Sequence, residues 1–124
     1  DHLAALMLAE DKRLYSASAF HCQQCIEKAL KAFLLFKNRK QFDGHNLTWL
    51  CKQAALMDGN FVKWIEKSAL LSRYYIETRY PADDLLEIDR ATLDDLLDST
   101  SEMLNFICDQ IKFDYNSFHK RRKK

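Results

Sequence analysis

The 124-residue chain has only two glycines and one proline. A β-rich fold of this length needs more of these residues at its turns, so the composition excludes a sheet-based architecture and indicates helices. The sequence also has no Walker-type phosphate loop, no GxGxxG motif and no HExxH motif. The enzyme classes that depend on those motifs therefore have no support.

Long apolar runs are absent as well, and no signal-peptide pattern is visible. We therefore expect a cytoplasmic protein without a membrane partner. Its four cysteines lie within apolar helical patterns, which is typical of free, buried thiols in a reducing compartment. They are Cys22, Cys25, Cys51 and Cys108. Cys22 and Cys25 have the spacing of half a zinc site, but no second pair follows, so we predict no metal and no cofactor.

The net charge of +1 conceals an uneven distribution of charge along the chain. Residues 83–114 carry ten acidic and two basic side chains, whereas residues 115–124 carry five basic and no acidic ones. The acidic block argues against a nucleic-acid surface on its own side of the molecule. It leaves room for a basic partner or for the basic face of a second copy of the chain.

Apolar residues at helical spacing predict five helices joined by short connections. The expected ranges are 1–13, 18–38, 47–57, 61–79 and 89–113. Ser16 or Ser18 is a candidate cap after a break near residue 15, and Asn46 is a candidate N-cap for the third helix. The prediction is an all-α, up-and-down helical bundle of four long helices plus a short helix. It forms one domain over residues 1–113, followed by a flexible basic tail over residues 114–124.

Residues 73–81 (RYYIETRYP) gather two arginines, three tyrosines and one carboxylate before the only proline. Since proline disfavours helical geometry in the residue before it, the helix should end near Arg79 or Tyr80. Arg73, Glu77 and Tyr80 then fall on one helix face. This face either binds a phosphate or carboxylate group through its arginines, or only ties down the helix end through an Arg73–Glu77 pair with half-buried tyrosines.

His45 precedes the third helix in the sequence GHNL. As a general base it would need a partner that the sequence does not locate. The alternative is a histidine that stabilises its loop through a hydrogen bond.

Three segments resemble signatures of HEPN domains, the "higher eukaryotes and prokaryotes nucleotide-binding" domains. They are residues 20–32 (FHCQQCIEKALKA), 44–47 (GHNL) and 75–81 (YIETRYP), in the family's order and spacing. The resemblance covers essentially residues 1–113. It implies a helical bundle, paired as a homodimer with the fourth-helix motifs facing each other across a cleft. It also implies a minimal nucleotidyltransferase as partner, as in toxin–antitoxin or defence pairs.

In HEPN proteins that cut RNA, an arginine is followed after four to six residues by a histidine. A tyrosine two residues further on is nucleotidylated by the partner in some members. Arg73 matches that arginine and Tyr80 that tyrosine, but Thr78 occupies the histidine position. A threonine hydroxyl neither accepts nor donates a proton readily near pH 7. The resemblance therefore implies a protein that binds a nucleotide, RNA or its partner without strong nuclease activity.

The candidate ligand-binding residues are Arg73, Glu77, Arg79 and Tyr80, with Tyr80 also a candidate modification site. The arginines could hold a phosphate, and Tyr80 could stack on a base. One alternative is an active ribonuclease toxin in which His45 or another group replaces the missing base. A second alternative is a purely structural interaction module that acts through its dimer surface.

Overall fold

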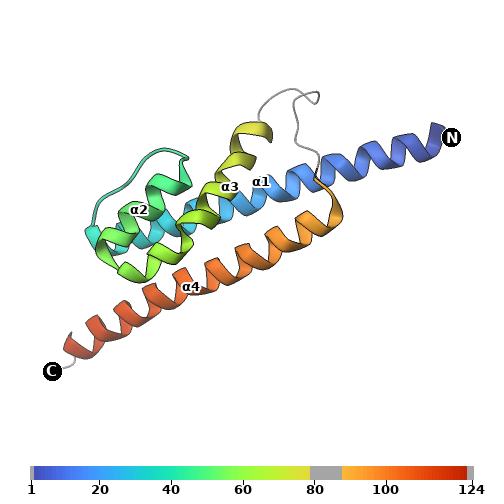
Figure 1. Cartoon of the computed structure of the whole chain (residues 1–124). Helices are drawn as coiled ribbons and strands as arrows, with labels where there is room; N and C mark the ends of the chain where they lie inside the picture. Colours follow the sequence, from blue (N-terminus) through green and yellow to red (C-terminus); the bar gives the residue numbers. More distant parts are fainter. Residues whose placement is uncertain (1, 79–87, 123–124) are drawn as a thin grey trace.

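The structure is a computed structural model that describes residues 2–78 and 88–122. Its elements are α1 (His2–Asn38), α2 (Leu47–Met57), the 3₁₀ helix η1 (Gly59–Trp64), α3 (Ile65–Thr78) and α4 (Arg90–Arg122) (Figure 1). No strand occurs among the described residues, so the all-α prediction is confirmed. None of the helices in these two ranges is long and apolar enough to cross a membrane.

The long helices alternate in direction along the chain. In Figure 1, α1 and α4 both run from right to left. The helix α3, which lies between them in the sequence, runs in the opposite direction. The shorter α2 and η1 lie in the connection from α1 to α3. Because α1 packs against α2, α3 and α4, it is the central helix of the bundle. The broad apolar face of residues 18–38 suits a helix with several neighbours.

Aromatic rings join the connection between α2 and α3 to the two long helices. Phe61 of η1 lies 4.4 Å from Phe33 of α1 between ring centroids, and 4.9 Å from Phe106 of α4 in an edge-on arrangement. Phe33 and Phe61 are completely buried. Aromatic pairs at these distances add to the free energy gained from burial alone, so η1 is anchored to both α1 and α4.

The predicted break near residue 15 is wrong, because α1 continues from His2 to Asn38 without interruption. Ser16 and Ala19 are both buried against the bundle. No glycine or proline interrupts this stretch, and packing of its inner face outweighs the modest preference of serine for a cap position. Ser16 is therefore a packed residue within a helix, and two predicted helices are one.

Two other helix boundaries also differ from the predicted ranges. The segment predicted to begin a helix at Phe61 lies first in the 3₁₀ helix η1. Its N-cap is Asp58, whose Oδ1 accepts a hydrogen bond from the backbone N–H of Asn60 at 3.0 Å. The last helix extends to Arg122 rather than ending near Phe113. The domain boundary at residue 113 and the flexibility of the tail stay predictions.

The start of α2 is fixed by two side chains. Asn46 is its N-cap, as predicted, and its side-chain oxygen accepts from the backbone N–H of Trp49 at 3.1 Å. The backbone N–H of Leu47 donates to Oγ of Ser72 on α3 at 2.8 Å. Just before this start, Gly44 has a φ of 102°, which a residue with a Cβ rarely adopts. Together these features fix the backbone on both sides of His45.

Candidate functional site

The predicted ligand-binding residues are only partly covered by the structure. Arg73 lies on α3 with an exposed side chain. Glu77 belongs to the last turn of α3, but its side chain lies outside the described part. Arg79 and Tyr80 lie outside the described residues. The convergence of these four side chains, and the role of Tyr80 as a modification site, therefore stay predictions.

His45 is the predicted site residue with the most complete surroundings. Its Nδ1 atom lies 2.9 Å from Oε1 of Glu27, which is 18 residues earlier in the chain on α1. The side chain of His45 is 51% exposed and that of Glu27 only 7%. The partner that the sequence could not locate is therefore a buried carboxylate beneath a half-exposed imidazole.

Glu27 is held by two further hydrogen bonds from its own helix. Nε2 of Gln23 donates to Oε1 at 3.1 Å, and Nζ of Lys31 donates to Oε2 at 3.2 Å. Burial alone would raise the pKa of the Glu27 carboxyl, but the hydrogen bonds from its three partners outweigh this effect and lower the pKa below its ordinary value of 4.5. Glu27 is therefore an ionised carboxylate at neutral pH.

The charge of Glu27 decides which nitrogen of His45 carries the hydrogen. An ionised carboxylate only accepts hydrogen bonds, so the 2.9 Å contact requires a hydrogen on Nδ1. A neutral His45 then has a bare Nε2, which can accept a hydrogen bond or a proton. None of the described residues forms a hydrogen bond with this Nε2.

The imidazole plane is held by aromatic stacking. The rings of His45 and Tyr75 are nearly parallel, with centroids 4.4 Å apart and an interplanar angle of 20°. Tyr75 also stacks with Phe20 of α1, at 6.0 Å and 23°. In addition, Nε2 of the buried Gln23 donates to the backbone oxygen of His45 at 3.4 Å. The histidine is thus fixed through its Nδ1, its ring face and its backbone.

A pocket of about 350 Å³ opens beside His45. It is lined by His45, Asn46, Thr48, Ser72 and Tyr75. These residues come from the start of α2 and from α3, the two segments joined by the hydrogen bond between Leu47 and Ser72. The lining combines an imidazole, two hydroxyl groups, an amide and a phenol ring. Such a lining suits a small polar ligand with an aromatic or hydroxylated part.

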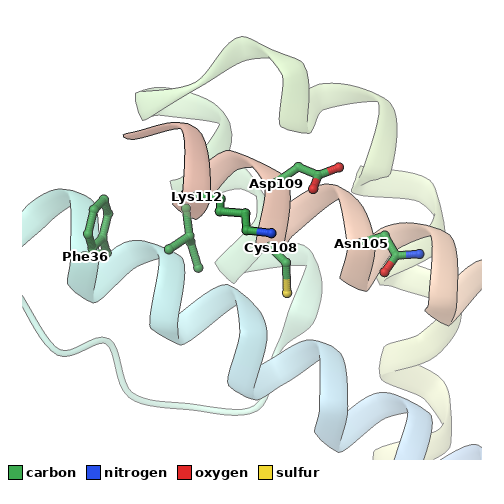
Figure 2. A pocket seen from close by; sticks show the side chains of 6 residues that line it. Phe36, Asn105, Cys108, Asp109 and Lys112 are labelled. Atoms are coloured by element: carbon green, nitrogen blue, oxygen red, sulfur yellow. The ribbon is translucent and has the colours of Figure 1, made fainter. Parts of the chain in front are cut away.

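A larger pocket, of about 660 Å³, lies between α1 and α4. Figure 2 shows Phe36 on α1 and four labelled side chains on α4 around it. Its lining residues are Phe36, Asn105, Cys108, Asp109, Ile111 and Lys112. It shares no residue with the pocket beside His45. No hydrogen-bonded acid–base pair is found among its lining residues.

The cysteines are free, and their burial differs from one to the next. Cys22 and Cys51 are buried, Cys25 is half-buried and Cys108 is exposed. The expectation that every thiol is buried is therefore wrong for Cys108. Within the described part of the chain, no group of three or more potential metal ligands comes together.

The residues of this site that were not predicted from the sequence include Glu27, Ser72 and Tyr75. Ser72 and Tyr75 are neighbours of Arg73, yet only their packing against residues 45–47 makes them part of a pocket. In the sequence, the spacing of Glu27 and Lys31 is that of an i,i+4 pair on the polar face of a helix. The structure retains that pair, at 3.2 Å, but buries the carboxylate.

The family model for the HEPN domain covers residues 1–111 of this chain. No curated protein and no solved structure matches this chain.

Proposed function

Because this chain belongs to the HEPN domain family, we propose that it is a homodimeric protein that binds a nucleotide or RNA and lacks the family's nuclease histidine. Membership of the family supports a nucleotide- or RNA-related function. The single observation that carries the proposal is the position of Arg73. It is exposed on α3, next in sequence to Ser72 of the pocket.

The proposed ligand-binding residues are Arg73, Glu77, Arg79 and Tyr80. Guanidinium groups bind phosphate oxygens through paired, charge-assisted hydrogen bonds. A tyrosine ring offers a stacking surface for any base. With Thr78 at the position of the nuclease histidine, such a site binds RNA without a group that moves a proton.

A binding titration tests this proposal. Labelled nucleotides and short single-stranded RNAs are titrated with the wild type and with the double variant Arg73→Ala/Arg79→Ala. Since hydrogen bonds to charged groups contribute about 1.5–3 kcal/mol each, we expect at least a tenfold loss of affinity. The control is Lys28→Ala/Lys52→Ala, which removes the same charge from two exposed positions. Equal binding by both double variants would contradict the assignment.

We also propose a cytoplasmic setting and a minimal nucleotidyltransferase partner, as is common for HEPN proteins. Tyr80 is the proposed target of that partner. Co-expression with a nucleotidyltransferase encoded beside this gene should yield a stable complex and a nucleotidyl group on Tyr80. The Tyr80→Phe variant should show no increase in mass under the same conditions. Analytical ultracentrifugation of the isolated chain should give a dimer, and a monomer at all concentrations would contradict that part.

A second candidate function is favoured by the hydrogen bond between Glu27 and His45. In this version the protein is a ribonuclease that uses His45 as its base. Nε2 takes the proton of a 2′-hydroxyl, the 2′-oxygen attacks the phosphorus, and the 5′-oxygen leaves with a proton from water. Expression without the partner should then stop growth, and His45→Ala should restore it. Harmless expression of the wild type would count against this version.

A purely structural interaction module remains the third proposal. In that case, changes to the arginine face would alter assembly, and no nucleotide or RNA would bind to the wild type.

A further inference from the structure

The pocket beside His45 contains a hydrogen-bond acceptor whose orientation is fixed. Nδ1 of the imidazole is committed to Glu27, and the ring lies flat on Tyr75. The remaining nitrogen, Nε2, belongs to a half-exposed ring that lines the pocket. When the imidazole is neutral, this nitrogen has a lone pair and no hydrogen. A ligand group that meets it must therefore donate a hydrogen bond.

The other polar groups of the pocket are complementary to a hydroxyl-bearing ligand. Oγ of Ser72 already accepts from the backbone N–H of Leu47, so its own hydrogen is available for donation. Oδ1 of Asn46 is occupied by the backbone N–H of Trp49, which leaves its amide hydrogens. Thr48 adds a hydroxyl that can donate or accept. The lining thus offers one fixed acceptor beside several donors.

This pattern distinguishes the three parts of a nucleotide. An ionised phosphate has only acceptors, so it would face the lone pair of Nε2 without a hydrogen between them. A ribose carries hydroxyl groups that donate and accept together, and the 2′-hydroxyl is the group that separates RNA from DNA. The pocket volume of about 350 Å³ is near the lower end of the roughly 300–1,000 Å³ typical of small-ligand sites. It suits one sugar with part of its base.

We infer that the pocket formed by His45, Ser72 and Tyr75 is a ribose site, in which Nε2 of His45 accepts a hydrogen bond from a 2′-hydroxyl and so selects ribonucleotides over deoxyribonucleotides. This inference rests on the proposed function and names the ligand class. Glu27 is a positioning residue in this site, because it holds the histidine tautomer without lining the pocket. Phosphate binding is left to the arginines of the neighbouring helix face.

The test compares three oligonucleotides of one sequence: RNA, DNA and 2′-O-methyl RNA. The 2′-O-methyl group keeps the oxygen but removes the hydrogen that Nε2 would accept. Fluorescence anisotropy measures the affinity for each oligonucleotide. The wild type should bind RNA about tenfold more tightly than either of the other two. His45→Phe retains a ring against Tyr75 but has no nitrogen, so it should bind all three with equal, DNA-like affinity.

Matched variants separate the possible outcomes. His21→Phe changes an exposed histidine outside the pocket and should keep the preference for RNA. Glu27→Gln should weaken the preference, since the histidine tautomer is no longer imposed. Equal affinity of the wild type for RNA and DNA, with binding still dependent on Arg73, would overturn the ribose site and leave the proposed function intact. Absence of binding to every oligonucleotide and mononucleotide would overturn both.

Discussion

His45 donates a hydrogen bond from Nδ1 to Oε1 of Glu27 at 2.9 Å and thereby joins a loop to the buried side of α1. The pair links residues that are 18 positions apart and lie on either side of the turn at Gly44. Because Gln23 also donates to the His45 backbone oxygen, α1 holds both the side chain and the main chain of this residue. The relationship is a structural tie, and in the ribose site proposed above it leaves Nε2 of His45 to accept a hydrogen bond.

Replacement of Glu27 by Gln should destabilise the protein at neutral pH. The change removes the negative charge that Lys31 and His45 contact. A neutral amide then occupies the buried position of the carboxylate. Hydrogen bonds to charged groups contribute about 1.5–3 kcal/mol, so we expect a loss of that order in the free energy of unfolding, measured by urea denaturation. Glu10→Gln, an exposed position on the same helix, should change it little.

The difference between wild type and Glu27→Gln should depend on pH. The pKa of Glu27 is lower in the folded protein than its ordinary value of 4.5. At a pH between these two pKa values, the folded state therefore binds fewer protons than the unfolded chain. The stabilisation by the Glu27 carboxylate is complete above pH 4.5. It is lost as the pH falls through the folded-state pKa. A difference that stays constant from pH 7 down to pH 3 would contradict an ionised Glu27 carboxylate in the folded protein.

Ser72→Ala should loosen the start of α2. The change removes the oxygen that accepts from the backbone N–H of Leu47 at 2.8 Å. An unsatisfied, partly buried donor costs about 1–3 kcal/mol, so urea denaturation should show a loss at the lower end of this range. Ser101→Ala on the exposed side of α4 is the control. Equal stability of the two variants would mean that water replaces the serine at no cost.

Asn46→Ala should remove the N-cap of α2. Its side-chain oxygen accepts from the backbone N–H of Trp49, and loss of such a cap costs about 1 kcal/mol. Asn46→Asp keeps an acceptor at this position and should keep most of the stability. Thermal denaturation followed by circular dichroism measures both. If alanine and aspartate had the same effect, capping would not be the role of Asn46.

The four thiols should react with iodoacetamide in order of their exposure. Cys108 is exposed, lines the larger pocket (Figure 2) and should react first. Burial, with the neighbouring thiols of Cys22 and Cys108, raises the pKa of Cys25, so it should follow more slowly. Cys51 is completely buried, its pKa is raised by that burial, and it should react only on unfolding. Peptide mass spectrometry of a time course gives the four rates, and fast labelling of Cys51 would contradict the packing.

The fold was largely predictable, because helix periodicity and the scarcity of turn residues can both be read from short stretches of the sequence. The pattern in residues 47–57 and the cap at Asn46 gave the bounds of α2 closely. The predicted break at residue 15 failed because two serines look like caps in the sequence. In the structure Ser16 is buried, and packing against the bundle keeps the helix continuous. That outcome depends on contacts with residues far along the chain.

The site was less predictable than the fold, because it is made by tertiary contacts. The motifs around Arg73 and His45 mark both as candidate site residues, and both belong to segments that surround the pocket. The i,i+4 spacing of Glu27 and Lys31 is typical of an exposed pair, and helical spacing does not show which polar side chains the bundle covers. The loop that returns over α1 buries Glu27 and gives His45 its partner. The contact between His45 and Glu27 therefore follows only from the relative placement of α1, α3 and this loop.

The most direct test of this account is the tautomer of His45. A ¹H–¹⁵N correlation spectrum of the imidazole nitrogens at pH 8 should show the hydrogen on Nδ1 and a bare Nε2, because the Glu27 carboxylate can only accept. The same spectrum of Glu27→Ala should lose this state. A hydrogen on Nε2 in the wild type would contradict the pair and, with it, the acceptor on which the ribose site depends.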